Sequence, residues 1–98
     1  MAEIILSQAA RADLAEIGEY GEAQFGRAAA DAYQHDIERA FDRLASYPRS
    51  GEAEPAWGSR FRCLMCNRHR IVYRISGDTV QIFRILHHSR DIPRHLPE

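Results

Sequence analysis

The chain has 98 residues, of which 45% are hydrophobic and 28% are charged. This length allows one domain with a modest core, and the composition excludes a disordered segment. No stretch approaches the about 20 apolar residues of a membrane-spanning helix, and no cationic segment precedes the short apolar stretch near the N-terminus. We therefore expect one cytoplasmic domain covering residues 1–98.

The charge is small in total but unevenly distributed along the chain. The formal net charge is −1, yet residues 1–54 carry 11 acidic and 5 basic side chains, whereas residues 55–98 carry 3 acidic and 8 basic ones. Every basic residue is arginine, which can bind carboxylate or phosphate with two hydrogen bonds. A genome rich in G and C would account for the use of arginine but not for its segregation. We predict a cationic surface in the C-terminal half.

The N-terminal half predicts a short strand followed by two helices. Residues 3–6 are β-prone, and Ser7 can cap a helix over about 8–25. The apolar positions of this helix are Ala10, Leu14, Ile17 and Gly21, and its outward positions are Asp13, Glu16, Glu19 and Glu22. Gly26 is expected to end the helix in the left-handed conformation.

A second helix is expected to follow almost at once, which makes an antiparallel helical hairpin. Its apolar face consists of Tyr33, Ile37, Ala40, Phe41 and Leu44. Pro48 ends this helix. The segment 47–59, YPRSGEAEPAWGS, has two prolines, two glycines and no periodicity, so it is predicted to be one long loop.

From residue 60 onward the pattern becomes that of strands. In residues 60–66 one face carries Phe61, Cys63 and Met65, and the other carries Arg60, Arg62, Leu64 and Cys66. After a turn at Asn67, residues 69–76 place Ile71, Tyr73 and Ile75 opposite Arg70, Val72 and Arg74. Residues 76–79 predict a type II′ hairpin turn. The near-continuous apolarity of residues 79–86 suits either a central strand covered on both faces or a bulge near Phe83.

These elements predict an α+β fold of order β-α-α-β-β-β. A helical hairpin would cover one face of a small, mostly antiparallel sheet, and the other face would carry the arginines. Cys63 and Cys66 form a CxxC pair followed by His69, but one pair supplies only two of the four ligands of a structural zinc site. We expect two ordinary reduced cysteines, no metal and no cofactor.

The candidate functional residues lie on the open sheet face and its margin: Arg60, Arg62, Arg70, Arg74, Arg84, His87, His88, Arg90 and Asp91. Arginines beside histidines could hold a phosphodiester and supply an acid or base for RNA cleavage. A solvated strand face is the alternative. Ser89 lacks the glycine-bracketed turn of a serine nucleophile, and His88 should not face it. Asp91 is expected to pair with an arginine or cap the turn before Pro93.

Two aromatic residues complete the candidates. Tyr73 shares its face with Ile71 and Ile75, so we expect it in the core. Trp57, in the long loop, is either an exposed contact residue or a lid over the core.

Four segments together resemble the ParE toxins of the ParE/RelE superfamily. They are S-x-x-A-x-x-D-L-x-x-I at residues 7–17, YPRSG after the second helix, R-I-V-Y-R-I at 70–75 and I-L-H-H-S-R-D at 85–91. The resemblance covers essentially the whole chain. It implies a toxin of a bacterial type II toxin–antitoxin system that is bound by a ParD-like antitoxin. An acidic, amphipathic segment of that antitoxin would become ordered on binding to the cationic sheet face and to an apolar groove beside the helices.

For ParE relatives the implied target is DNA gyrase, whereas RelE relatives cut mRNA on the ribosome. We therefore expect a toxin that inhibits gyrase without catalysing a reaction, with target contacts at His87, His88, Arg90 and Asp91 and antitoxin contacts at Arg60, Arg62, Arg70 and Arg74. The alternative is a ribosome-dependent endoribonuclease, with direct nucleic-acid binding, in which Arg60, Arg62 and Arg74 hold phosphate and His87 is the acid or base. The absence of lysine, and of any tyrosine after Tyr73, departs from the nuclease pattern.

Overall fold

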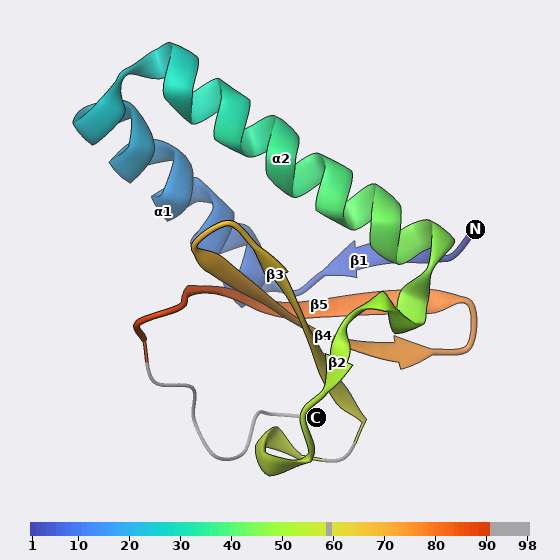
Figure 1. Cartoon of the computed structure of the whole chain (residues 1–98). Helices are drawn as coiled ribbons and strands as arrows, with labels where there is room; N and C mark the ends of the chain where they lie inside the picture. Colours follow the sequence, from blue (N-terminus) through green and yellow to red (C-terminus); the bar gives the residue numbers. More distant parts are fainter. Residues whose placement is uncertain (59, 91–98) are drawn as a thin grey trace.

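Two long helices lie on one face of a five-stranded sheet (Figure 1). The computed structural model describes residues 1–58 and 60–90. The strands are β1 (Glu3–Leu6), β2 (Glu52–Ala53), β3 (Phe61–Cys66), β4 (His69–Ser76) and β5 (Thr79–His87), and the helices are α1 (Gln8–Phe25) and α2 (Arg27–Ser46). The strand order is β1-β5-β4-β3-β2, with β1 parallel to β5 and the other pairs antiparallel. The predicted α+β fold is confirmed. None of the helices in the described residues is long and apolar enough to span a membrane.

Both ends of α1 follow from local chemistry. The Ser7 hydroxyl accepts a hydrogen bond from the Ala10 N–H, as expected of an N-cap. Gly26 ends α1 with a positive φ of 90°, but its ψ of 164° lies outside the predicted left-handed helical region. The reason is that α2 begins at the next residue, so Gly26 must redirect the chain rather than extend a turn.

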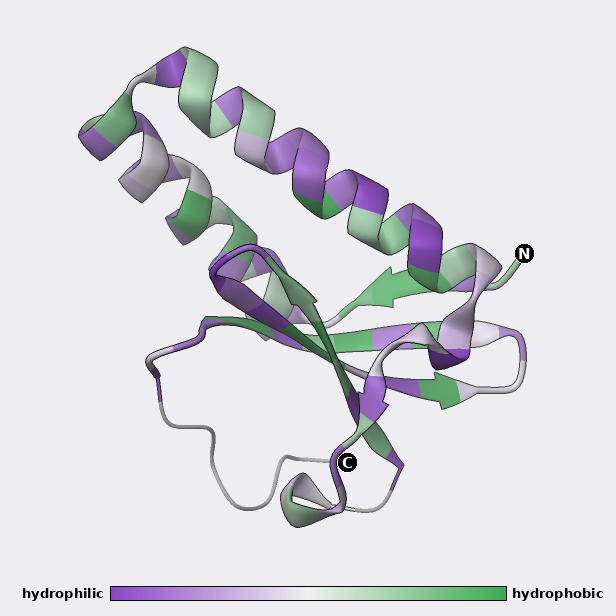
Figure 2. Cartoon of the chain, in the orientation of Figure 1, coloured by the Kyte–Doolittle hydropathy of each residue, from purple (hydrophilic) through white to green (hydrophobic). Residues whose placement is uncertain are grey.

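The core lies between the helices and the sheet. The predicted apolar face of α2 is confirmed, because Ile37 and Leu44 are fully buried and Tyr33, Ala40 and Phe41 pack against the same cluster. The sheet contributes Ile71, Tyr73, Val80, Ile82 and Ile85. Figure 2 shows the corresponding mixture of hydrophobic and hydrophilic residues along the strands and α2. Tyr73 is therefore a core residue, as predicted.

A bulge in β5 changes which residues face the helices. The register shifts opposite Val72 and Tyr73, since Tyr73 pairs with Ile82 whereas Val72 pairs with Arg84. Phe83 is the extra residue, which agrees with the bulge that was one of the two alternatives for this strand. Gly77, with φ 59°, forms the predicted two-residue hairpin turn between β4 and β5.

The sheet face away from the helices is not simply an arginine face, which corrects the prediction. It carries a second apolar cluster, in which Phe61 and Val72 are buried and Trp57 and Phe83 pack against them. Arg74 lies over this cluster, with its guanidinium carbon 5.2 Å from the centroid of the Phe83 ring. Trp57 thus covers an apolar cluster, in agreement with the lid alternative, but on the opposite side of the sheet from the helices.

The predicted long loop contains more structure than expected. Two short 3-10 helices, η1 (Pro48–Ser50) and η2 (Pro55–Trp57), flank β2, which pairs with β3. The Tyr73 hydroxyl donates to the Pro48 carbonyl at 2.6 Å and accepts from the Gly51 N–H at 3.0 Å. A Cβ at Gly51 would lie 2.7 Å from that hydroxyl, so only glycine fits. The YPRSG loop is therefore held by a tyrosine from β4.

Candidate functional site: a groove beside the helical hairpin

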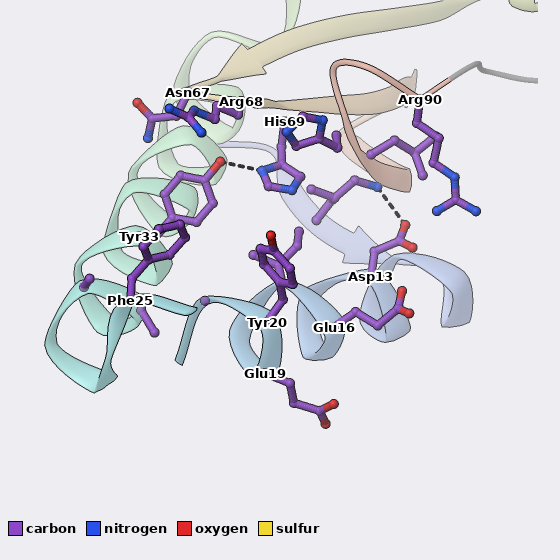
Figure 3. Close-up of a pocket in the computed structure, with 17 residues that line it drawn as sticks. Asp13, Glu16, Glu19, Tyr20, Phe25, Tyr33, Asn67, Arg68, His69 and Arg90 are labelled. Carbon is purple, nitrogen blue, oxygen red and sulfur yellow. Dashed lines mark hydrogen bonds between the residues drawn. The ribbon is translucent and has the colours of Figure 1, made fainter. Parts of the chain in front are cut away.

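The helical hairpin and the nearby end of the sheet enclose an open groove of about 1040 Å³, which we call the hairpin groove (Figure 3). Its apolar wall comes from α1 and α2 and includes Ile17, Tyr20, Phe25, Ala29, Ala30 and Tyr33. Its polar end comes from the β3–β4 turn, β4 and the end of β5, and includes Arg68, His69, His87 and Arg90.

Two aromatic side chains of the apolar wall are largely exposed to solvent. Tyr20 is 64% exposed and Phe25 is 67% exposed, although both line the groove. Large aromatic side chains that remain in contact with water around a concave surface are typical of protein-binding sites. The wall therefore has the properties of a surface that a second protein covers.

Three histidines cluster at the polar end, where His69 and His87 line the groove and His88 lies beside His87. The rings of His69 and His87 are 5.5 Å apart between centroids, and those of His87 and His88 are 4.5 Å apart. The Tyr33 hydroxyl of α2 lies 2.5 Å from Nδ1 of His69 (Figure 3). Burial lowers the pKa of His69 below its ordinary value, and the neighbouring His87 and His88 lower it further. His69 is thus held neutral more strongly than an exposed histidine.

Asp13 fixes α1 against β5 at one side of the groove. Its carboxylate accepts hydrogen bonds from Nε and Nη2 of Arg84 at 2.9 and 3.0 Å and from the Ile85 N–H at 2.9 Å. The bond to Asp13 raises the pKa of Arg84. The prediction that Asp13 points outward is wrong, because only 5% of it is exposed. Arg84 likewise turns toward α1 and not toward the open face.

The histidine and arginines of the nuclease alternative are not brought together. His87 is the last residue of β5, and it pairs with His69 on the helix side of the sheet rather than on the predicted open face. Arg74 lies five residues along β4 from His69, which is about 16 Å in a strand. Arg62 pairs with Tyr73 and donates to the carbonyls of Arg49 and Gly51.

The remaining predicted site residues are spread over different surfaces. Arg60 precedes β3 with a positive φ of 71° and is exposed, whereas Arg70 is half-buried in β4. His88 and Arg90 follow β5 beside His87. Asp91 lies outside the described residues.

Ser89 contacts His87 rather than His88. Its hydroxyl oxygen lies 2.7 Å from Nδ1 of His87, and its N–H donates to the same nitrogen at 3.2 Å. The expectation that His88 does not face Ser89 agrees with this arrangement. The contact between Ser89 and His87 was not predicted from the sequence.

The two cysteines have separate environments. Cys63 pairs with Val72 and Cys66 with His69, so the alternation of the strand directs their side chains to opposite faces. Burial raises the pKa of the Cys63 thiol to about 11 and also raises that of Cys66. Both thiols are free. This arrangement suits two ordinary protonated cysteines.

Comparisons with known proteins agree with the fold. The family described as "ParE toxin of type II toxin-antitoxin system, parDE" matches residues 4–92. A protein called Toxin ParE1 from Mycobacterium tuberculosis H37Rv is 34% identical over 93 residues, covering 94% of this chain and 95% of the relative. Toxin ParE1 from Caulobacter vibrioides is 31% identical over 91 residues, covering 93% and 94%.

Two solved structures share the architecture. A chromosomal ParDE toxin–antitoxin system from P. aeruginosa superposes with a TM-score of 0.76 at 24% identity, covering 89% of this chain and 96% of that one. A YoeB-YefM complex from Staphylococcus aureus gives a TM-score of 0.55 at 16% identity, covering 90% and 98%. The fold is that of the small ParE- and YoeB-like toxins. By its sequence, the chain belongs to the ParE toxin family of type II toxin–antitoxin systems.

The groove residues that sequence reasoning missed include Tyr33, Arg68 and His69. Tyr33 was assigned to the core, and its hydroxyl reaches His69 across 36 residues of sequence. His69 was considered only as a metal ligand. The signal that could have revealed this contact is the expected strand alternation, which places His69 on the same face as Ile71 and Tyr73 and hence under the helices.

Proposed function

We propose that this chain is a toxin that inhibits DNA gyrase by binding to it, and that a ParD-like antitoxin neutralises it. Membership of the ParE family supports a toxin. The similarity to a structure described as a ParDE toxin–antitoxin system supports a ParD-like partner. The proposed activity is an interaction and requires no reaction at the hairpin groove.

The separation of His87 from Arg62 and Arg74 is the observation that favours binding over catalysis. A nuclease needs its phosphate-binding groups and its acid or base around one phosphodiester. Here Arg62 is bonded to loop carbonyls, and Arg74 lies over aromatic rings and hydrogen-bonds to Gln81. A binding surface does not need this convergence.

The proposed contact surfaces follow from the same geometry. The antitoxin covers the hairpin groove, whose exposed aromatic wall suits an amphipathic segment. Arg60 and Arg70 remain proposed antitoxin contacts on the sheet, whereas Arg62 and Arg74 have internal roles. The proposed gyrase contacts are His87, His88, Arg90 and Asp91. Because His87 and Arg90 also line the groove, a bound antitoxin would block the target surface directly.

The test is to compare gyrase and translation in the presence of the purified protein. We expect it to block supercoiling by gyrase and to leave translation intact. His87→Ala should weaken the block, whereas His35→Ala, on the exposed side of α2, should not. Translation arrest with mRNA cuts at ribosomal A sites, lost in His87→Ala, would instead establish the RelE-like nuclease.

Neutralisation needs its own experiment. The neighbouring reading frame is expected to encode a small acidic antitoxin. Co-expression of that product should restore growth to cells that produce this chain, and the two proteins should purify together. Failure of every such candidate to restore growth would contradict the proposed partner.

A further inference from the structure

The side chains of His87 and Arg90 have unused hydrogen-bonding capacity at the polar end of the hairpin groove. The Arg90 N–H donates to the His87 carbonyl at 2.9 Å, so one tight turn holds both residues at the lining of the groove. Within residues 1–58 and 60–90, the Arg90 guanidinium has neither a hydrogen bond nor an ion pair. Nδ1 of His87 is engaged by Ser89, which leaves Nε2 as the nitrogen available to a ligand.

Ser89 allows His87 to be neutral or charged. In the observed geometry the Ser89 N–H donates to Nδ1, which is the arrangement that suits a ring with no proton on that nitrogen. After protonation, Nδ1–H can donate instead to the Ser89 hydroxyl oxygen, which lies 2.7 Å away. The ring then presents a charged Nε2–H without changing its position.

The surroundings of His87 decide where an added proton goes. The titratable and charged groups that line the groove with it come from α1, α2, the β3–β4 turn, β4 and its own segment: Asp13, Glu16, Glu19, Tyr20, Tyr33, Arg68, His69 and Arg90, with His88 beside its ring. The carboxylate of Asp13 is paired with Arg84. Since burial keeps the pKa of His69 low, His69 is disfavoured as the site of an added proton.

We infer that His87 and Arg90 form a carboxylate-binding subsite at the polar end of the hairpin groove, and that His87 takes up a proton when an aspartate or glutamate of the antitoxin binds there. The inference rests on the proposed function, because the antitoxin is the occupant. A carboxylate suits the site because Arg90 offers a planar pair of donors and His87 a single one. The adjacent aromatic wall receives the apolar side chains of the same peptide segment.

Proton uptake makes the affinity depend on pH. A complex that binds one more proton than its free components becomes tighter as the pH falls, by at most about tenfold per pH unit. Neutralisation of the toxin is then strongest in mildly acidic solution and weaker at alkaline pH.

The first experiment uses the chain alone with N-acetylglutamate as the probe. The imidazole signals are followed by NMR at pH 6.5 and assigned with His87→Gln, and sodium chloride of equal ionic strength is the control. We expect the His87 signal to shift saturably, the apparent affinity to fall several-fold in Arg90→Gln, and the His35 signal to stay in place. Absence of a saturable His87 shift would overturn the subsite.

The second experiment measures the affinity of the growth-restoring antitoxin by calorimetry at pH 6 and pH 8. The unmodified chain should bind several-fold more tightly at pH 6, His87→Gln should remove that difference, and His35→Gln should keep it. Circular dichroism checks that the variants are folded. Equal affinity at the two pH values would refute proton uptake. No binding at either pH would contradict the proposed function and this occupant, while the N-acetylglutamate titration still decides the subsite.

Discussion

Replacing Asp13 by alanine should destabilise the fold, because three donors lose their common acceptor. The Ile85 N–H is buried, and leaving it unpaired costs about 1–3 kcal/mol. The two bonds to Arg84 are charge-assisted, but the Arg84 side chain is 30% exposed and can recover water. We therefore expect a total loss of about 3 kcal/mol, at the lower end of the range for a broken buried ion pair.

Urea unfolding monitored by circular dichroism measures this loss. For a domain of this size about 3 kcal/mol corresponds to a Tm lower by about 15 °C. Asp13→Asn should lose less, about 1–2 kcal/mol, because the amide oxygen can still accept one of the three bonds. Asp31→Ala, at an exposed position of α2, is the matched control and should change the free energy of unfolding by less than about 0.5 kcal/mol.

A double-mutant cycle with Arg84→Ala separates the ion pair from the bond to the backbone. The coupling free energy between Asp13 and Arg84 should be about 1–2 kcal/mol, leaving a residual loss from the Ile85 N–H. If Asp13→Ala were no more destabilising than Asp31→Ala, the proposed role of Asp13 in fixing α1 to β5 would be refuted.

Three further predictions concern single side chains. Tyr73→Phe removes the hydrogen bonds to the YPRSG loop and should lower the free energy of unfolding in urea by about 2–3 kcal/mol. Tyr47 is 69% exposed, so Tyr47→Phe should change this free energy little. Equal effects of the two substitutions would contradict the role of Tyr73 in holding the loop. The folded pKa of His69 lies below its ordinary 6.5, so neutral His69 contributes stability that is present above pH 6.5 and is lost as the pH falls. The free energy of unfolding should therefore decline less between pH 7 and pH 5 in His69→Gln than in the unmodified chain, whereas His35→Gln should leave this decline unchanged. With a pKa of about 11 against an ordinary 9.0, Cys63 should react with iodoacetamide at pH 8 about 100-fold more slowly than in urea, as followed by mass spectrometry, and similar rates would contradict this thiol environment.

The local elements could be predicted because each depends on a few neighbouring residues. The α2 face from Tyr33 to Leu44, the Gly77 turn and the bulge at Phe83 were all visible as spacing or turn chemistry. Asp13 was misplaced although its position contained a warning, since it lies three residues after Ala10 and four before Ile17, on the buried stripe of α1. A carboxylate on that stripe needs a partner from elsewhere, and the partner is 71 residues away.

The functional surface was predicted only in outline. An apolar groove beside the helices was expected as a consequence of the family resemblance, but its polar end was not. The positions of Arg62, Arg84 and His87 depend on which strands pair and where the bulge falls, and a single sequence does not specify these long-range choices. The predicted contacts His87, His88 and Arg90 gather at one end of the sheet, whereas the predicted arginine contacts do not form one surface.

The parallel pairing of β1 with β5 also sets the order in which the protein can mature. Glu3 pairs with Thr79, and the Ser7 hydroxyl donates to the Phe83 carbonyl across 76 residues of sequence. During synthesis on the ribosome, β1 therefore cannot pair until β5 has been made, whereas the local contacts of the helical hairpin can form earlier. The histidine end of the groove is assembled only when the last strand has been synthesised.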